Sequence, residues 1–148
     1  WAEFTVVIPC AVQMEPGEVS IVHYGHGFLG DRREVQGDYL AEMANNNRWV
    51  LISFDTMGLT RHDLIMILRL CVNQAHLAEE LTDMILQSHL NRLIGEKALL
   101  NNLGHVDPIR EALSGGVKRI AYYGNSLGGI TGGGFVSLSD TVNRAVFG

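Results

Sequence analysis

Ser126 stands in a sequence pattern that suits nucleophilic chemistry. Residues 124–128 read GNSLG, which matches G-x-S-x-G, and they directly follow a β-rich run at 117–123. This pattern is typical of a sharp turn from a strand into a helix, where the central serine is strained and exposed. A side chain at Gly124 or Gly128 would collide with a neighbouring strand or helix. We therefore predict a nucleophilic serine, the alternative being an ordinary helix-capping serine.

The backbone around this serine also offers a place for negative charge. N–H groups at the start of a helix favour anions, so an oxyanion would be stabilised beside Ser126. A second glycine-rich loop, residues 25–30 (GHGFLG), follows an expected strand at 18–24. Both loops come at carboxyl ends of strands, where open α/β sheets bind their ligands.

The elements that must position these loops alternate between strand and helix. Strands are expected at 4–12, 18–24, 49–54, 117–123 and 142–147, with helices between them and after Ser126. This alternation predicts an α/β fold with a doubly wound, mostly parallel sheet and helices on both faces. Residues 60–105 are mainly helical and exceed a usual crossover. We interpret them as an inserted helical hairpin, which serves either as packing or as a lid or partner-binding face.

Two details of this insertion follow from the pattern. Thr60 and Asp63 have the spacing of a capping box at a helix start. Residues 64–72 are apolar nearly all round, so we expect that helix to be deeply covered.

Composition excludes several classes of protein. The chain has 148 residues, 47% hydrophobic and 18% charged, which fits one globular domain. A formal charge of −5 without a basic cluster argues against nucleic acid as a partner, and no apolar run is long enough for a membrane span. Cys10 and Cys71 suit neither a disulfide framework nor a zinc site, so we expect buried thiols. The compartment is left open.

Three loops together resemble the α/β-hydrolase family. Residues 25–28 (GHGF) look like its oxyanion loop, residues 55–58 (DTMG) like its D-x-x-G loop, and residues 124–128 like its nucleophile elbow, in the same order. The resemblance covers about residues 4–148. It implies a single incomplete hydrolase domain that is the amino-terminal half to two-thirds of such a fold.

This resemblance implies roles for particular residues. The Ser126 Oγ would be the nucleophile of an acyl-enzyme mechanism, and the N–H groups of Phe28 and Leu127 would form the oxyanion hole. A small-molecule ester or acyl compound would be the substrate, without cofactor or metal. Supporting residues would be His26, Gly27, Gly124 and Gly128.

The sequence departs from the family in the proton-transfer groups. The family's acid and histidine follow the nucleophile, but no histidine follows Ser126, and Asp140 is the only acid after it. We expect His26 to be structural, and His76 and His89 to be solvated. All six histidines precede the serine, namely His23, His26, His62, His76, His89 and His105.

We therefore expect the acid and base of the triad to lie beyond Gly148. The 148-residue chain would then have negligible esterase turnover. Its unpaired sheet edge would favour self-association.

The main hypothesis is thus a carboxylic-ester hydrolase of esterase or lipase type. The same scaffold would equally serve hydrolysis of peptide, amide or carbon–carbon bonds, because a fold does not fix a substrate. A non-catalytic binding module that keeps the elbow for packing is the third hypothesis. Nucleotide binding is disfavoured, since neither a P-loop nor a dinucleotide-binding fingerprint is present.

Overall fold

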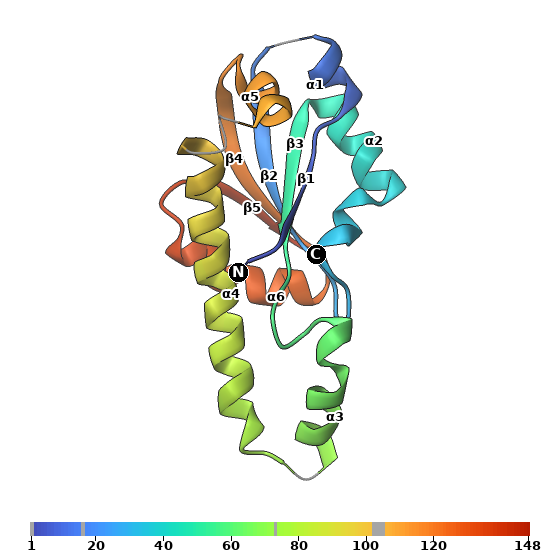
Figure 1. Cartoon of the computed structure of the whole chain (residues 1–148), viewed down its shortest axis with the longest axis vertical. Coiled ribbons are helices and arrows are strands. Elements are labelled where there is room, and N and C mark those ends of the chain that lie inside the picture. Colours follow the sequence, from blue (N-terminus) through green and yellow to red (C-terminus); the bar gives the residue numbers. More distant parts are fainter. Residues whose placement is uncertain (1, 16, 73, 102–105) are drawn as a thin grey trace.

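A five-stranded mixed sheet forms the centre of the molecule (Figure 1). The computed structural model describes residues 2–15, 17–72, 74–101 and 106–148, so His105 lies outside the described residues. The strand order is β1-β3-β2-β4-β5, and every neighbouring pair is parallel except β1 with β3. The strands are β1 (Phe4–Val7), β2 (Val19–Gly25), β3 (Trp49–Phe54), β4 (Val117–Gly124) and β5 (Arg144–Phe147).

The predicted α/β class is confirmed, but the sheet is partly antiparallel at the β1 edge. The expected strand at 4–12 ends early, and the helix α1 (Cys10–Met14) follows it after Pro9. This short connection returns the chain in the opposite direction, and antiparallel strands need no long crossover.

Helices cover both faces of the sheet, as predicted. On one face, β2 and β3 side chains pack with Leu40 and Ala44 of α2 (Asp38–Asn47). On the other, they pack with Leu99 of α4 (Leu77–Asn101) and Ile109 of α5 (Asp107–Leu113). Strand side chains alternate between the two faces, for example Ile21 and the neighbouring Val22. Both faces of the central strands are therefore buried.

The remaining helices lie near the carboxyl ends of the strands. They are the 3₁₀ turns η1 (Arg32–Gln36) and η2 (Arg61–Asp63), α3 (Leu64–Val72) and α6 (Leu127–Leu138), which follows β4. The expected helix at 33–46 is thus divided between η1 and α2. Helices α3 and α4 form a hairpin that extends past this end of the sheet (Figure 1).

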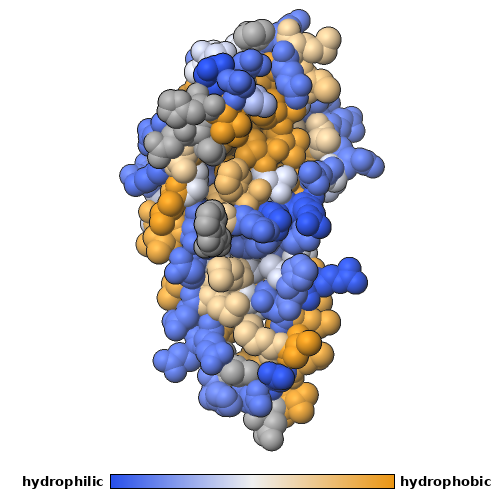
Figure 2. Space-filling view, in the orientation of Figure 1, coloured by the Kyte–Doolittle hydropathy of each residue, from blue (hydrophilic) through white to orange (hydrophobic). Residues whose placement is uncertain are grey.

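The prediction that residues 64–72 are deeply covered is wrong. No residue of α3 is buried, and Ile65 and Val72 are 66% and 81% exposed. Because α3 packs against α4 and η2 beyond the sheet, it has no second layer to cover it. Hydrophobic residues at the lower right of Figure 2 lie over this part of the molecule. None of the described helices has both the length and the apolar character that crossing a membrane requires.

Two further expectations about burial are wrong. Cys10 and Cys71 are exposed, because α1 begins at the surface and α3 lies off the sheet. His89 is buried rather than solvated, with 5% of its surface exposed. This histidine lies on the side of α4 that faces α6, where its ring approaches Gly134.

Candidate functional site

Ser126 lies at the turn where β4 ends and α6 begins. Its backbone angles, φ 53° and ψ −115°, are rare for a residue with a side chain and costly to hold. The residue is nevertheless exposed to solvent. Its neighbour Asn125 donates its N–H to the Gly25 carbonyl over 2.9 Å, which fastens the turn to the end of β2. The structure thus holds Ser126 in the strained, exposed conformation expected from its sequence.

The glycines beside the serine allow backbone to pack directly against backbone. A Cβ added at Gly128 would lie 2.2 Å from the Gly25 carbonyl oxygen, and one at Gly124 would lie 2.4 Å from the Gly128 oxygen. Contacts this short do not occur with a real side chain. The ends of β2 and β4 and the first turn of α6 therefore approach one another only because both positions are glycine.

The loop at residues 25–30 lies beside the serine. A Cβ added at Gly27 would be 3.9 Å from the Ser126 Cβ. Phe28 follows Gly27, and Leu127 follows Ser126. Neither the Phe28 N–H nor the Leu127 N–H donates a backbone hydrogen bond to another described residue. Phe28 also has a largely exposed side chain. The two candidate oxyanion donors, the N–H groups of Phe28 and Leu127, thus have no acceptor among the described residues. Each directly follows one of the two residues, Gly27 and Ser126, that lie close together.

Glu34 connects this loop to the serine turn. Its Oε2 accepts the Gly27 N–H over 3.1 Å, while Oε1 accepts the Asn125 amide over 3.0 Å and the Tyr24 hydroxyl over 2.6 Å. Burial and the bond to Glu34 raise the pKa of Tyr24 well above its ordinary value. Sequence reasoning missed Glu34, because nothing in its local pattern distinguishes it from an exposed helix residue.

Removing the Glu34 carboxylate should loosen the site. We expect Glu34→Ala to lower the free energy of unfolding by about 2 kcal/mol, since the Gly27 N–H and Tyr24 hydroxyl lose their acceptor. Urea unfolding followed by circular dichroism measures this change. The matched control is Glu42→Ala, at an exposed position of α2, which should stay within about 0.5 kcal/mol of the parent. Equal effects of the two substitutions would contradict the role given to Glu34.

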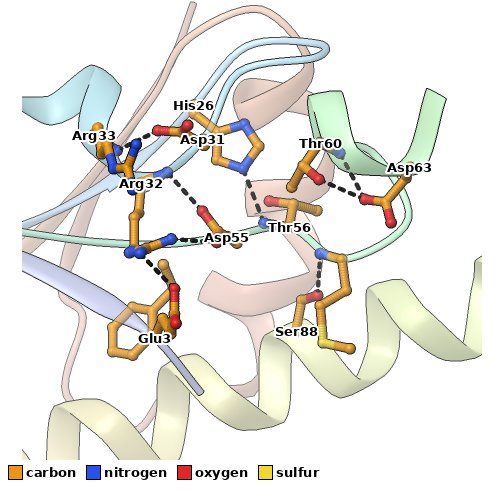
Figure 3. A network of polar contacts seen from close by, with 12 residues as sticks. Glu3, His26, Asp31, Arg32, Arg33, Asp55, Thr56, Thr60, Asp63 and Ser88 are labelled. Atoms are coloured by element: carbon orange, nitrogen blue, oxygen red, sulfur yellow. Dashed lines mark hydrogen bonds and ion pairs between the residues drawn. The ribbon is translucent and has the colours of Figure 1, made fainter. Parts of the chain in front are cut away.

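His26 is held as a structural residue. It is buried, and its Nε2 accepts the Thr56 N–H over 2.9 Å (Figure 3). The proton must therefore be on Nδ1, which lies 2.8 Å from the Gly27 carbonyl and donates to it. Burial lowers the pKa of His26, which keeps the ring neutral. With both ring nitrogens engaged, His26 has no lone pair to accept a proton from Ser126.

Residues 55–60 link the loop at residues 25–30 to the α3–α4 hairpin (Figure 3). Asp55 accepts bonds from the Arg32 N–H and Nη1 over 2.7 and 2.8 Å, and Arg32 also pairs with Glu3. On the other side, the Met57 N–H donates to Ser88 Oγ of α4 over 2.7 Å. The predicted capping box is confirmed: the Asp63 side chain accepts the Thr60 N–H over 3.0 Å, and the Thr60 side chain faces the N–H of Asp63 in return.

A buried polar cluster lies between α4, α6 and the sheet. His23 Nε2 and Glu96 Oε2 are 2.6 Å apart, at ion-pair distance although not aligned as a hydrogen bond, and Thr141 donates its hydroxyl to Glu96. Burial lowers the pKa of His23. Burial alone would raise the pKa of Glu96, but its contacts with His23 and Thr141 reverse this and lower it. Sequence reasoning missed this cluster, because the polar residues of α4 were expected to face solvent.

No described side chain hydrogen-bonds the Ser126 hydroxyl. Asp140, the only acid after the serine, is exposed and pairs with Lys97 over 3.6 Å. A 690 Å³ cavity lies between α1 and α5, at the opposite end of the sheet from Ser126. Over the described ranges, no three His, Cys, Asp or Glu side chains gather as metal ligands would.

Comparisons with protein-family models, with curated proteins and with solved structures each find no match for this chain.

Proposed function

We propose that the chain carries the nucleophile and oxyanion hole of a serine hydrolase of α/β-hydrolase type that acts on carboxylic esters. The observation that supports this most directly is the conformation of Ser126, strained yet exposed at a strand-to-helix turn. Backbone strain of this size persists only where the surroundings enforce it, and it is concentrated at functional sites. The N–H groups of Phe28 and Leu127, which bond to no described residue, supply the second requirement, donors for a developing negative charge.

In this mechanism the Ser126 Oγ attacks the carbonyl carbon of the ester. A bond forms between Oγ and carbon, and the carbonyl oxygen becomes an oxyanion that accepts hydrogen bonds from the N–H groups of Phe28 and Leu127. Collapse of this intermediate breaks the bond to the alcohol, which leaves with the proton taken from the serine, and water then hydrolyses the acyl-enzyme. We assign the proton transfer to a base and an acid outside the described residues.

Covalent labelling tests the nucleophile. In the protein expressed from its complete gene, a fluorophosphonate should modify Ser126, as located by mass spectrometry of the peptides. Ser126→Ala should abolish the labelling, while Ser137→Ala, at an exposed serine of the same helix, should leave it unchanged. The 148-residue chain by itself should hydrolyse p-nitrophenyl esters negligibly. The proposal fails if Ser126 in the complete protein stays unlabelled or if Ser126→Ala is labelled as the parent is.

A non-catalytic binding module remains the second candidate. The observation in its favour is that no described side chain bonds to the Ser126 hydroxyl as a base would. Such a module would keep the glycine-lined turn for packing and would show no labelling at Ser126. A hydrolase of peptide, amide or carbon–carbon bonds would instead be labelled, and its substrates would separate it from an esterase.

A further inference from the structure

Arg92 of α4 connects the two sides of the proposed oxyanion hole. We propose that it is a positioning residue that holds both backbone donors in place, an inference that rests on the proposed function. Its side chain is buried, with 1% of its surface exposed. It comes from the inserted hairpin rather than from either glycine-rich loop.

The guanidinium group reaches two different strands. Nη2 donates to the Phe54 carbonyl at the end of β3 over 3.3 Å and to Thr56 Oγ1 over 3.1 Å. Nη1 donates to the Tyr122 hydroxyl of β4 over 3.2 Å. A planar fork of N–H groups is suited to hold several acceptors in fixed relation. Arg92 therefore fixes the end of β3 relative to β4.

The contact with Thr56 connects Arg92 to the loop at residues 25–30 through further hydrogen bonds. Thr56 donates its N–H to His26, which in turn donates to the carbonyl of Gly27, the residue before Phe28. The bond from Arg92 to the Thr56 hydroxyl therefore holds the residue on which the oxyanion loop rests.

The second path leads to the helix that follows the serine. The Tyr122 hydroxyl accepts from Arg92 and donates to the Gly128 carbonyl over 2.6 Å. Gly128 directly follows Leu127, the other proposed donor. Arg92 is thus two hydrogen bonds from the first turn of α6.

No described carboxylate is paired with the positive charge at this position. None of the ion pairs between described residues includes Arg92, and its guanidinium lies 5.8 Å from the centroid of the Tyr122 ring and 5.9 Å from that of Phe135. Removing a charge from water is costly unless the charge is paired and hydrogen-bonded. A positioning role explains why a buried cation bridges these acceptors.

The decisive variant is Arg92→Met in the protein expressed from its complete gene. It keeps the length and bulk of the side chain but removes the fork of donors. We expect the variant to fold but to unfold at somewhat lower urea, because the Phe54 carbonyl and the hydroxyls of Thr56 and Tyr122 lose a donor. The fluorophosphonate reaction at Ser126 should slow about tenfold, since displaced donors stabilise the oxyanion less well.

Ester hydrolysis gives a readout that a purely structural role would not move. The concentration of active sites is counted by fluorophosphonate labelling of a parallel sample, and kcat is expressed per active site. Arg92→Met should then lower kcat about tenfold and leave KM within about twofold, because the oxyanion forms only in the transition state. Arg92→Lys keeps the charge and one donor direction, so it should restore part of the loss. The control is Arg110→Met, at an exposed position of α5, which should match the parent.

Two conservative variants keep the proposal testable if Arg92→Met fails to fold. Tyr122→Phe removes one path and Thr56→Val the other, and each should slow labelling about threefold. If the parent is not labelled at Ser126, the proposed function fails and this inference with it. If the parent is labelled and the folded variants react at the parental rate, only the role of Arg92 is overturned.

Discussion

Gly128→Ala is expected to lower the free energy of unfolding by at least about 3 kcal/mol and to prevent labelling of Ser126. The added Cβ would lie 2.2 Å from the Gly25 carbonyl oxygen and 2.8 Å from that of His26. Both obstacles are backbone atoms, so no side chain can rotate away. Relief requires the first turn of α6 to move away from the end of β2, which separates the serine from the loop at residues 25–30.

Gly133→Ala is the matched control in the same helix. A Cβ at Gly133 meets nothing within 4 Å. In a helix interior, alanine is more favourable than glycine by about 1 kcal/mol. Gly133→Ala should therefore be neutral or stabilising by up to that amount and should be labelled normally. Urea unfolding and fluorophosphonate labelling, measured side by side, decide the matter. Similar stabilities for the two variants would show that backbone contact at Gly128 does not hold the turn.

The serine turn could be predicted from the sequence because its requirements are local. A β-rich run, a G-x-S-x-G pattern and a following helix lie within about 20 contiguous residues, and each acts through the conformation of its own backbone. The strained angles of Ser126 and the close contacts at Gly124 and Gly128 follow from that pattern. The α/β class could be predicted for the same reason, since strand and helix alternate along the chain.

The environment of the α3–α4 hairpin could not be predicted in this way. An apolar helix is expected to be buried and a polar face to be solvated, but these rules assume where the partner surface lies. Here α3 extends past the sheet, while α4 turns Ser88, Arg92 and Glu96 toward the interior. Their spacing of four residues places them on one face of the helix. The spacing of these three polar residues was the one indication in the sequence that they share a face. Whether that face is buried depends on hydrogen-bond partners from segments far away in the sequence.

The antiparallel pairing of β1 has a similar origin. Its four residues would suit either direction, and the choice depends on the length of the connection through α1. Glu34 likewise becomes a connecting residue only when the loop at 25–30 and the serine turn lie side by side. Local pattern thus predicted the strained, exposed serine, while the groups that hold its turn depend on tertiary contacts.

We also expect the protein to lose stability as the pH falls from 7.5 to 5.5. Three histidines, His23, His26 and His89, are buried, and burial lowers the pKa of each. The positive charge of Arg92 acts in the same direction on all three, whereas Glu96 opposes it at His23. The folded protein therefore keeps these rings neutral at a pH where the unfolded chain binds protons.

The sign and size of the effect follow from that difference. A group with a lowered pKa contributes its full stability above its unfolded value, about 6.5 for histidine, and loses it as the pH falls toward the folded value. Each buried histidine costs up to about 1.4 kcal/mol per pH unit in this range. Unfolded histidine is only half protonated at pH 6.5, so each group contributes at most about 1 kcal/mol between pH 6.5 and 5.5. With three such groups, we expect a loss of about 2 to 3 kcal/mol over this interval.

Urea unfolding at pH 7.5, 6.5 and 5.5 measures the loss, and NMR titration of the imidazole protons assigns it. His89→Gln should reduce the slope, because it removes one ring that resists protonation without touching either glycine-rich loop. Replacing His62 and His76, which are exposed, by Gln should leave the slope unchanged. A free energy of unfolding that is flat or rises toward pH 5.5 would mean that the three rings are charged in the folded state. The hydrogen bond from the Thr56 N–H to His26 could then not exist as described, because a protonated Nε2 cannot accept it.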